Sequence, residues 1–259
     1  MSAISLLEKY RPQQLCELLG QDWVSEQLTK YLQSPYPCAF LFAGETGTGK
    51  TTAALLLAEA LGVQVDQQEF GGLHQIASGE QTGESVRKLM AGLSCRPFFG
   101  SGWKVAIVNE ADAMTPGAAF IWLDALENLP PNTVVIFTTN NAAKIPARLR
   151  DRCERLDFES SALLLRPTLQ DLIERIWRDE GRPATTAPQV EVLRVADDNG
   201  NTSFRRLLQS LTLYLRVPVA PAAPAPPSVP VTLPTEKAKK ERSAAALKAW
   251  ETRRKAKAS

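Results

Sequence analysis

The residues best suited to chemistry run from Gly44 to Thr51, GETGTGKT, and match the phosphate-loop pattern G-x-x-x-x-G-K-[ST]. A triphosphate is a dense anion, so its site needs inward-pointing backbone N–H groups, and glycines let the backbone curl closely around it. We expect Lys50 to reach the β- and γ-phosphates and the hydroxyl of Thr51 to bind Mg²⁺. The pattern therefore predicts a site for ATP and Mg²⁺. The residues expected at the nucleotide are Gly44, Glu45, Thr46, Gly47, Thr48, Gly49, Lys50, Thr51 and Thr52.

A second polar group follows the apolar stretch KVAIV in the segment KVAIVNEAD, Lys104 to Asp112. P-loop ATPases usually carry Asp then Glu here, the first for Mg²⁺ and the second to polarise the attacking water. Glu110 fits the second role, but Asn109 stands in the first. An amide oxygen supplies no negative charge, so we expect weak Mg²⁺ affinity and slow turnover. Asp112 is either a structural cap or a partial substitute for the missing carboxylate.

A third polar position is Asn140, which follows the apolar stretch TVVIFTT. Asparagine at the end of a strand is commonly a turn residue. Its place after the two preceding motifs favours a contact with the γ-phosphate or the attacking water.

These motifs need a parallel sheet to bring them together. Apolar runs alternate with helix-forming segments, which is typical of an α/β fold with helices on both faces of the sheet. The strands we expect are Ala39–Gly44, Glu69–Ala77, Lys104–Val108, Thr133–Thr139 and Arg155–Phe158. The helices between them are expected at Asp22–Gln33, Lys50–Gly62, Glu84–Leu93 and Ala118–Leu129. Three further helices, expected at Leu169–Arg178, Val190–Ala196 and Ser203–Leu215, indicate a small helical bundle after the sheet.

The C-terminal part has a different composition. Residues 217–234 hold seven prolines in eighteen residues, which favours an extended, semi-rigid spacer. Residues 235–259 carry nine Lys or Arg against three Glu, so a net +6 lies in this tail and −4 in residues 1–234. The tail is either a solvated extension or a nucleic-acid-binding segment joined to the core by the linker, with Trp250 able to stack on a base.

Bulk composition is that of a globular protein, with 44% apolar and 22% charged residues. We expect no membrane span and no secretory signal, hence a cytoplasmic or nucleoid-associated protein. The spacing of Cys16, Cys38, Cys95 and Cys153 supports neither a zinc site nor a disulfide framework, and we expect mostly buried thiols.

Taken in order, LLEKYRPQQLCELLGQ, GETGTGKTTAALLLAEAL, NEADAM, TTNN and LRDRC resemble the ATPase subunits of DNA sliding-clamp loaders, notably replication factor C small subunits and their phage equivalents. The resemblance covers about residues 6–215. It implies an AAA+ core with a parallel sheet and a three-helix lid. It also implies that adenine lies near Tyr10, Arg11 and the turn from Leu19 to Gln21.

The resemblance assigns two arginines as well. Arg152 in LRDRC matches the arginine that the family projects into a neighbouring subunit's ATP site, where a guanidinium stabilises the transferring phosphoryl group. Arg205 in GNTSFRRLL matches the phosphate-sensing arginine of the lid, and Arg206 is the alternative because extra residues blur the register.

These observations predict an ATPase core at 1–160, a lid at 161–216, a proline-rich linker at 217–234 and a basic tail at 235–259. A clamp-loader collar domain is not expected in this chain. The leading function is a DNA-dependent ATPase in replication, assembled as a homo- or hetero-oligomer through its ATPase domains, with DNA and a sliding clamp or other replication protein as partners. The alternatives are a non-hydrolysing nucleotide-binding subunit and an AAA+ loader or remodeller of another DNA-bound protein.

Overall fold

The computed structural model of the protein describes residues 5–193 and 195–216. The chain divides into the units Met1–Val217 and Pro218–Ser259. The linker predicted at 217–234 and the tail predicted at 235–259 lie outside the described residues. Within the described ranges, no helix is long and apolar enough to cross a membrane.

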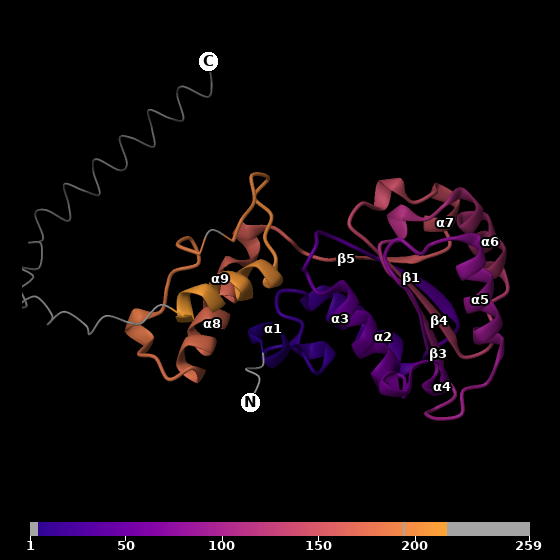
Figure 1. Cartoon of the computed structure of the whole chain (residues 1–259), viewed down its shortest axis with the longest axis horizontal. Coiled ribbons are helices and arrows are strands. Elements are labelled where there is room, and N and C mark those ends of the chain that lie inside the picture. Colours follow the sequence, from indigo (N-terminus) through magenta and orange to yellow (C-terminus); the bar gives the residue numbers. More distant parts are fainter. Residues whose placement is uncertain (1–4, 194, 217–259) are drawn as a thin grey trace, which may run out of the picture. The chain divides into compact units, whose positions relative to one another are not determined.

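The centre of the fold is a five-stranded parallel sheet with the strand order β2-β3-β4-β1-β5. Its strands are β1 (Cys38–Ala43), β2 (Leu73–Ile76), β3 (Lys104–Val108), β4 (Thr133–Thr139) and β5 (Glu154–Asp157). Strands β3 and β4 are buried along their whole length, which explains their nearly continuous apolar sequence. Because β3, β4 and β1 are parallel neighbours, the loops that follow them emerge at one edge of the sheet (Figure 1).

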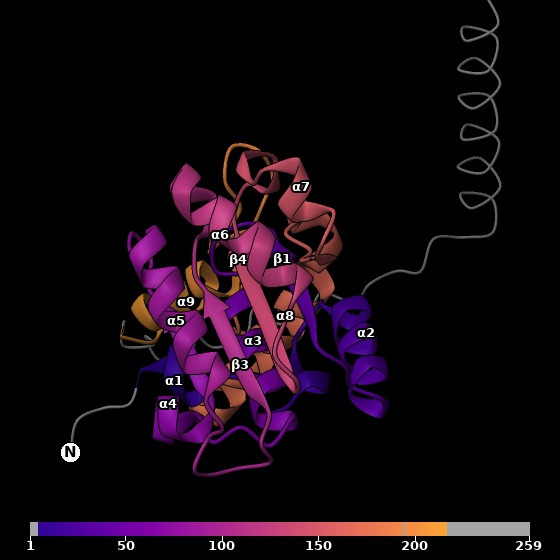
Figure 2. The same ribbon diagram turned by 90° about the vertical axis from the view of Figure 1, so that its right-hand side faces the viewer.

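Helices cover both faces of this sheet. On one face lie α2 (Asp22–Gln33) and α3 (Lys50–Ala60), and on the other lie α5 (Gly83–Ser94) and α6 (Pro116–Glu127) (Figures 1 and 2). Side chains of β1 alternate between the two cores: Phe40 and Phe42 face α2 and α3, whereas Leu41 faces α5 and α6. This packing holds the strand ends, and therefore the loops after them, in fixed positions.

The helical part after the sheet consists of α8 (Ala162–Asp179) and α9 (Phe204–Arg216), with α1 (Leu6–Lys9) packed against α9. Leu6 of α1 is buried in the same apolar cluster as Leu169 and Ile173 of α8 and Leu207 of α9. The N-terminal segment thus contributes a helix to the lid.

The helix predicted at Val190–Ala196 is wrong, because the described residues there form turns and the only helix described between α8 and α9 is the 3-10 turn η5 (Ala184–Thr186). Side chains satisfy the backbone of this segment instead. The N–H of Val190 donates to Oε1 of Gln170 at 3.0 Å, and the carbonyl of Val195 accepts from Oγ1 of Thr202 at 3.1 Å.

The strand predicted at Glu69–Ala77 is shorter than expected, because Gln68–Gly71 forms helix α4 and Gly72 turns the chain with a φ of 93°. The expectation of mostly buried thiols is also wrong, since Cys16 and Cys95 are exposed and Cys38 and Cys153 are half-buried. The remaining short helices are η1 (Leu15–Glu17), η2 (Val65–Gln67), η3 (Ala111–Ala113), η4 (Ala142–Lys144) and α7 (Ala147–Arg150).

Candidate functional site: a nucleotide site at the carboxyl edge of the sheet

The phosphate loop joins β1 to α3 and lies directly against the lid. A Cβ atom on Gly47 would come within 2.9 Å of both Cβ of Arg205 and Oγ of Ser203. Gly47 and Gly49 also have positive φ angles, 83° and 103°, which glycine adopts without strain. Glycine at position 47 therefore lets the start of α9 approach the loop, as a lid over a nucleotide requires.

The side chain of Lys50 is held beneath this loop and is only 8% exposed. Its Nζ donates to the carbonyls of Gly44 and Glu45 at 2.7 and 2.8 Å and to Oδ1 of Asn140 at 2.9 Å. Burial lowers the pKa of Lys50 to about 8, against the opposing effect of nearby carboxylates, chiefly Glu45. The three N–H donors of this ammonium group all have oxygen partners, and a phosphate oxygen could replace one of them.

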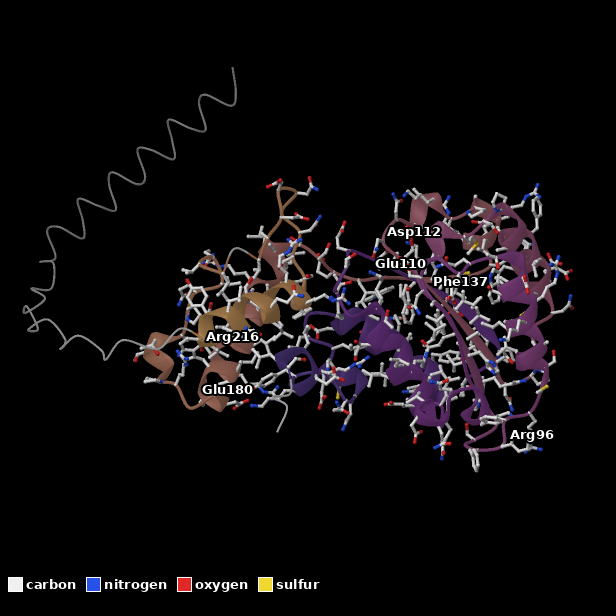
Figure 3. The ribbon with its side chains drawn as sticks, viewed as in Figure 1. Arg96, Glu110, Asp112, Phe137, Glu180 and Arg216 are labelled. Atoms are coloured by element: carbon white, nitrogen blue, oxygen red, sulfur yellow. The ribbon has the colours of Figure 1, made fainter. Side chains whose placement is uncertain are left out.

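The two residues predicted to hold Mg²⁺ are brought together. The hydroxyl of Thr51 donates to Oδ1 of Asn109 at 3.3 Å. Both are oxygen donors of the kind that Mg²⁺ takes, so the pair fits the metal, although neither carries a negative charge. The carboxylates of Glu110 and Asp112 both act on the charge of Lys50. They lie near one another at the end of the sheet beyond Phe137 (Figure 3).

Asp112 has a structural role in this arrangement. Its Oδ1 accepts from Oγ1 of Thr139 at 2.7 Å and from the N–H of Asn140 at 3.3 Å. These two hydrogen bonds tie the turn after β3 to the end of β4. They position the side chain of Asn140 next to Lys50.

Glu110 is exposed, and its backbone adopts the left-handed conformation, with φ 50° and ψ 51°. Its carboxylate accepts a hydrogen bond from the hydroxyl of Ser78, and its flanking carbonyls accept from Nε2 of Gln81. Neither Ser78 nor Gln81 belongs to a motif, so sequence reasoning missed both. One signal could have found them: polar residues follow β2, and because β2 pairs with β3 in parallel, they lie at the same edge of the sheet as Glu110.

The two predicted arginines lie in different places. Arg152 is exposed after α7, where its guanidinium donates to the carbonyl of Arg148 at 2.8 Å and pairs with the carboxylate of Glu127. Arg205 lies beside Gly47, whereas Nη1 of Arg206 donates to the carbonyl of Val195 at 3.2 Å. Of the two lid arginines, Arg205 is the one placed beside the phosphate loop.

The side chains predicted to contact adenine have partners in three different places. The hydroxyl of Tyr10 donates to Oδ2 of Asp179 at 3.2 Å, and Arg11 pairs with Glu8 at 3.8 Å. The buried amide of Gln21 exchanges hydrogen bonds of 2.9 and 2.8 Å with the backbone of Glu159. The adenine-binding role of Tyr10 and Arg11 stays a prediction.

Comparison with known proteins assigns the chain to a sequence family. Residues 20–162, more than half of the chain, match the sequence family described as DNA polymerase III, delta subunit. The chain belongs to this clamp-loader family of AAA+ proteins. The matched span includes the phosphate loop, Asn109, Glu110, Asn140 and Arg152.

Curated relatives of this clamp-loader chain carry related names. It is 33% identical over 148 residues to the replication factor C small subunit of Methanoregula boonei, covering 57% of this chain and 45% of that protein. It is 31% identical over 172 residues to replication factor C subunit 5 of Mus musculus, covering 65% of this chain and 50% of that protein. It is 27% identical over 221 residues to DNA polymerase III subunit tau of Bacillus subtilis, covering 77% and 38%. The chain thus spans about half the length, or less, of these relatives.

Solved structures support the AAA+ fold of this family member. A DNA polymerase III gamma subunit-related protein from Thermotoga maritima matches with a TM-score of 0.53 and 18% identity, covering 73% of this chain and 57% of that one. A single-residue variant of RuvB from the same organism matches with a TM-score of 0.51 and 15% identity, covering 79% and 72%. At these identities the likeness concerns the fold alone.

Proposed function

We propose that this chain binds and hydrolyses ATP as a clamp-loader-like AAA+ ATPase acting in DNA replication. The observation that carries the proposal is the meeting of Lys50, the Thr51–Asn109 pair, Glu110 and Asn140 where β1, β3 and β4 end. Each of these groups has a separate task in phosphoryl transfer, and their convergence is the arrangement that such chemistry requires. The names of the replication factor C and DNA polymerase III relatives support the cellular setting.

The residue roles follow from charge and position. Lys50 neutralises the β- and γ-phosphates, and Thr51 and Asn109 would hold Mg²⁺, which neutralises charge on the phosphate oxygens. Glu110 orients the attacking water and accepts its proton, while Asn140 hydrogen-bonds that water or the γ-phosphate. Arg205 comes from the lid beside Gly47, where a guanidinium favours the nucleotide-bound, closed lid.

Arg152 acts on a neighbouring subunit in this proposal. Its exposed guanidinium contacts Arg148 and Glu127 rather than any residue of the chain's own phosphate loop. ATP would then lie at an interface between ATPase domains of the same or a related chain. Hydrolysis of ATP would then release DNA and a sliding clamp or other replication protein. This would take place in the cytoplasm or on the nucleoid.

A second candidate is a subunit that binds nucleotide without hydrolysing it. Two observations favour it: Asn109 brings no negative charge to the metal, and the carboxylate of Glu110 is engaged by Ser78. In that case ATP would be a structural ligand that holds an assembly together. The two candidates differ only in turnover, so a single set of variants separates them.

The test is ATP binding and hydrolysis by the full chain, with Mg²⁺, primed DNA and co-purifying proteins whose stoichiometry is measured by native mass spectrometry. We expect the wild type to bind and hydrolyse ATP, Glu110→Gln to bind without hydrolysis, and Lys50→Ala to lose binding. Turnover in the wild type no higher than in Glu110→Gln, with binding intact, would establish the second candidate. Equal nucleotide affinity of the wild type and Lys50→Ala would refute both.

A further inference from the structure

A groove of about 420 Å³ lies between α2 and β5, apart from the nucleotide site. Two of its lining residues show where it lies: Tyr36 precedes β1, and Glu154 begins β5. The groove is therefore near the amino ends of these strands, whereas the phosphate loop follows the carboxyl end of β1. No step of the proposed reaction uses it.

Four aromatic side chains line this groove. Tyr31 and Phe40 are buried and meet edge to face, with ring centroids 5.1 Å apart. Tyr36 packs edge to face on Tyr31 at 5.4 Å, and both Tyr36 and Trp23 are about half exposed. The buried pair thus forms an apolar floor, and the exposed pair offers ring surface to a ligand.

The ring of Tyr36 is held in place from two sides. Its hydroxyl donates to the carboxylate of Glu154, and its backbone carbonyl accepts from the hydroxyl of Tyr31 at 2.6 Å. A side chain that is already ordered loses little freedom when a ligand binds. This part of the groove is therefore preformed.

The charges around the groove favour an uncharged ligand. Lys30 is paired with Glu26 at 2.6 Å, and Arg155 is paired with Asp157 at 2.7 Å. Glu154 adds a third carboxylate to the lining. Because each of these cations already has an anionic partner, a polyanion such as DNA would meet carboxylates that repel it.

The sequence contains an uncharged segment with suitable chemistry. Residues 217–234 include no Asp, Glu, Lys or Arg, and proline recurs at every third position. The prolines in this period are Pro218, Pro221, Pro224, Pro227 and Pro230. A polyproline II helix has three residues per turn and no internal hydrogen bonds, so the period predicts one edge of prolines and a row of free carbonyls. The indole N–H of Trp23 can donate to such a carbonyl.

The length of this segment suits a contact between molecules. At ~3.1 Å per residue, its eighteen residues would extend about 56 Å in the polyproline II form. The four residues of β5 span only roughly 13 Å, so a few residues of the segment suffice to fill the groove beside it. Because proline-rich segments are semi-rigid, they fold back on their own molecule less readily than they reach a neighbour.

We propose that the groove between α2 and β5 binds the proline-rich segment, residues 217–234, of a second copy of this chain. Prolines of one edge pack on the rings of Trp23 and Tyr36, in the way that aromatic-lined grooves bind proline-rich segments. Each copy offers one groove and one segment, so the contact is head-to-tail and leads to a ring or an open chain of copies. It requires no nucleotide and does not depend on the proposed function.

The first test follows the anisotropy of a fluorescein-labelled peptide of residues 217–234 as the full chain is added without nucleotide. We expect Trp23→Ala in the full chain to weaken binding by about fivefold or more. Phe120→Ala, which removes another exposed aromatic ring, is the matched control and should match the wild type.

Peptide variants test the period of three. Replacing both Pro221 and Pro224 by alanine removes two prolines of the predicted edge and should weaken binding by about fivefold or more. Replacing both Pro226 and Pro234 removes two prolines outside the period and should change it by less than about twofold. Binding that is insensitive to Trp23→Ala, or equal losses in the two peptides, would overturn the proposal.

Mixing two full-chain variants tests the second copy as the occupant. Trp23→Ala keeps its proline-rich segment, and the chain with Pro221→Ala and Pro224→Ala keeps its groove. Without nucleotide, a tagged copy of one should capture the other about fivefold or more above capture between two copies of the same variant. Mixed capture no greater than capture between identical variants would overturn the proposal. So would displacement of the labelled peptide by an uncharged proline-free peptide or by single-stranded DNA at the concentration at which the unlabelled segment displaces it.

Discussion

Nζ of Lys50 lies 2.9 Å from Oδ1 of Asn140, so the helix that follows the phosphate loop is joined directly to the end of β4. The N–H of Asn140 in turn donates to Oδ1 of Asp112 at 3.3 Å. Residues that follow three different strands are linked in one chain of hydrogen bonds. A bound γ-phosphate would compete with Asn140 for Lys50, which leaves the amide free to contact the phosphate or the water.

Replacing Asn140 by alanine should affect hydrolysis more than binding. Lys50 keeps its carbonyl partners, so we expect the ATP dissociation constant to change by less than about threefold while single-turnover hydrolysis falls by roughly 10- to 100-fold. Equilibrium titration and quenched-flow assays measure the two. Asn141→Ala is the control, since Asn141 caps the following turn at the N–H of Ala143. Equal losses in both variants would assign Asn140 a turn role.

Asn109→Asp should strengthen Mg²⁺ binding and speed up hydrolysis. A carboxylate next to the Thr51 hydroxyl adds the negative charge that Mg²⁺ favours, so half-maximal activity should need less Mg²⁺ and kcat should rise. Hydrolysis measured across a Mg²⁺ titration checks this expectation. Asn128→Asp, exposed at the end of α6, controls for the added charge. If Asn109→Asp is no faster at any Mg²⁺ concentration, the amide does not limit turnover.

Arg152→Ala should leave ATP binding nearly intact and remove most hydrolysis, because its guanidinium serves a neighbouring site. Mixing it with Glu110→Ala should restore part of the activity, since each variant supplies what the other lacks. Arg148→Ala is a matched control, because Arg152 contacts the backbone carbonyl of Arg148, which the variant keeps. Glu127→Gln, which frees Arg152 from its ion pair, should not reduce hydrolysis. No rescue at any mixing ratio would argue against a shared interface.

The two lid arginines should separate by phenotype. Arg205→Ala removes a cation beside Gly47, so ATP affinity or turnover should fall several-fold with little change in melting temperature. Arg206→Ala removes the hydrogen bond to the carbonyl of Val195, at a cost of about 1 kcal/mol of folding stability, and should leave turnover closer to the wild type. Thermal melts and steady-state assays on both variants decide which of the two is the phosphate-sensing arginine. The reverse pattern would make Arg206 the sensor.

Local sequence patterns were sufficient for the elements whose structure depends on nearby residues. Helix α2 and strands β3 and β4 have the predicted bounds, because an apolar period of 3.6 or a short run rich in β-branched and other apolar residues is visible in the chain itself. The phosphate loop could be predicted for the same reason: its glycines, Lys50 and Thr51 act together within eight residues. The family resemblance then singled out Arg152, which no local pattern marks.

The basic tail and its role in DNA binding lie outside the described residues and stay a prediction. Deleting residues 235–259 remains the direct test, through DNA affinity at low and moderate salt.

The sequence by itself thus determined most of the strands, the phosphate loop and the order of the polar strand ends along the chain, because each is a run of contiguous residues. Only the tertiary structure decided which side chains meet Glu110. Ser78 and Gln81 reach it because β2 pairs with β3, a contact between residues about thirty positions apart that no periodicity reports. It also decided the turns from Val190 to Leu193, where the lid core buries the apolar residues and side chains satisfy the backbone without a helix.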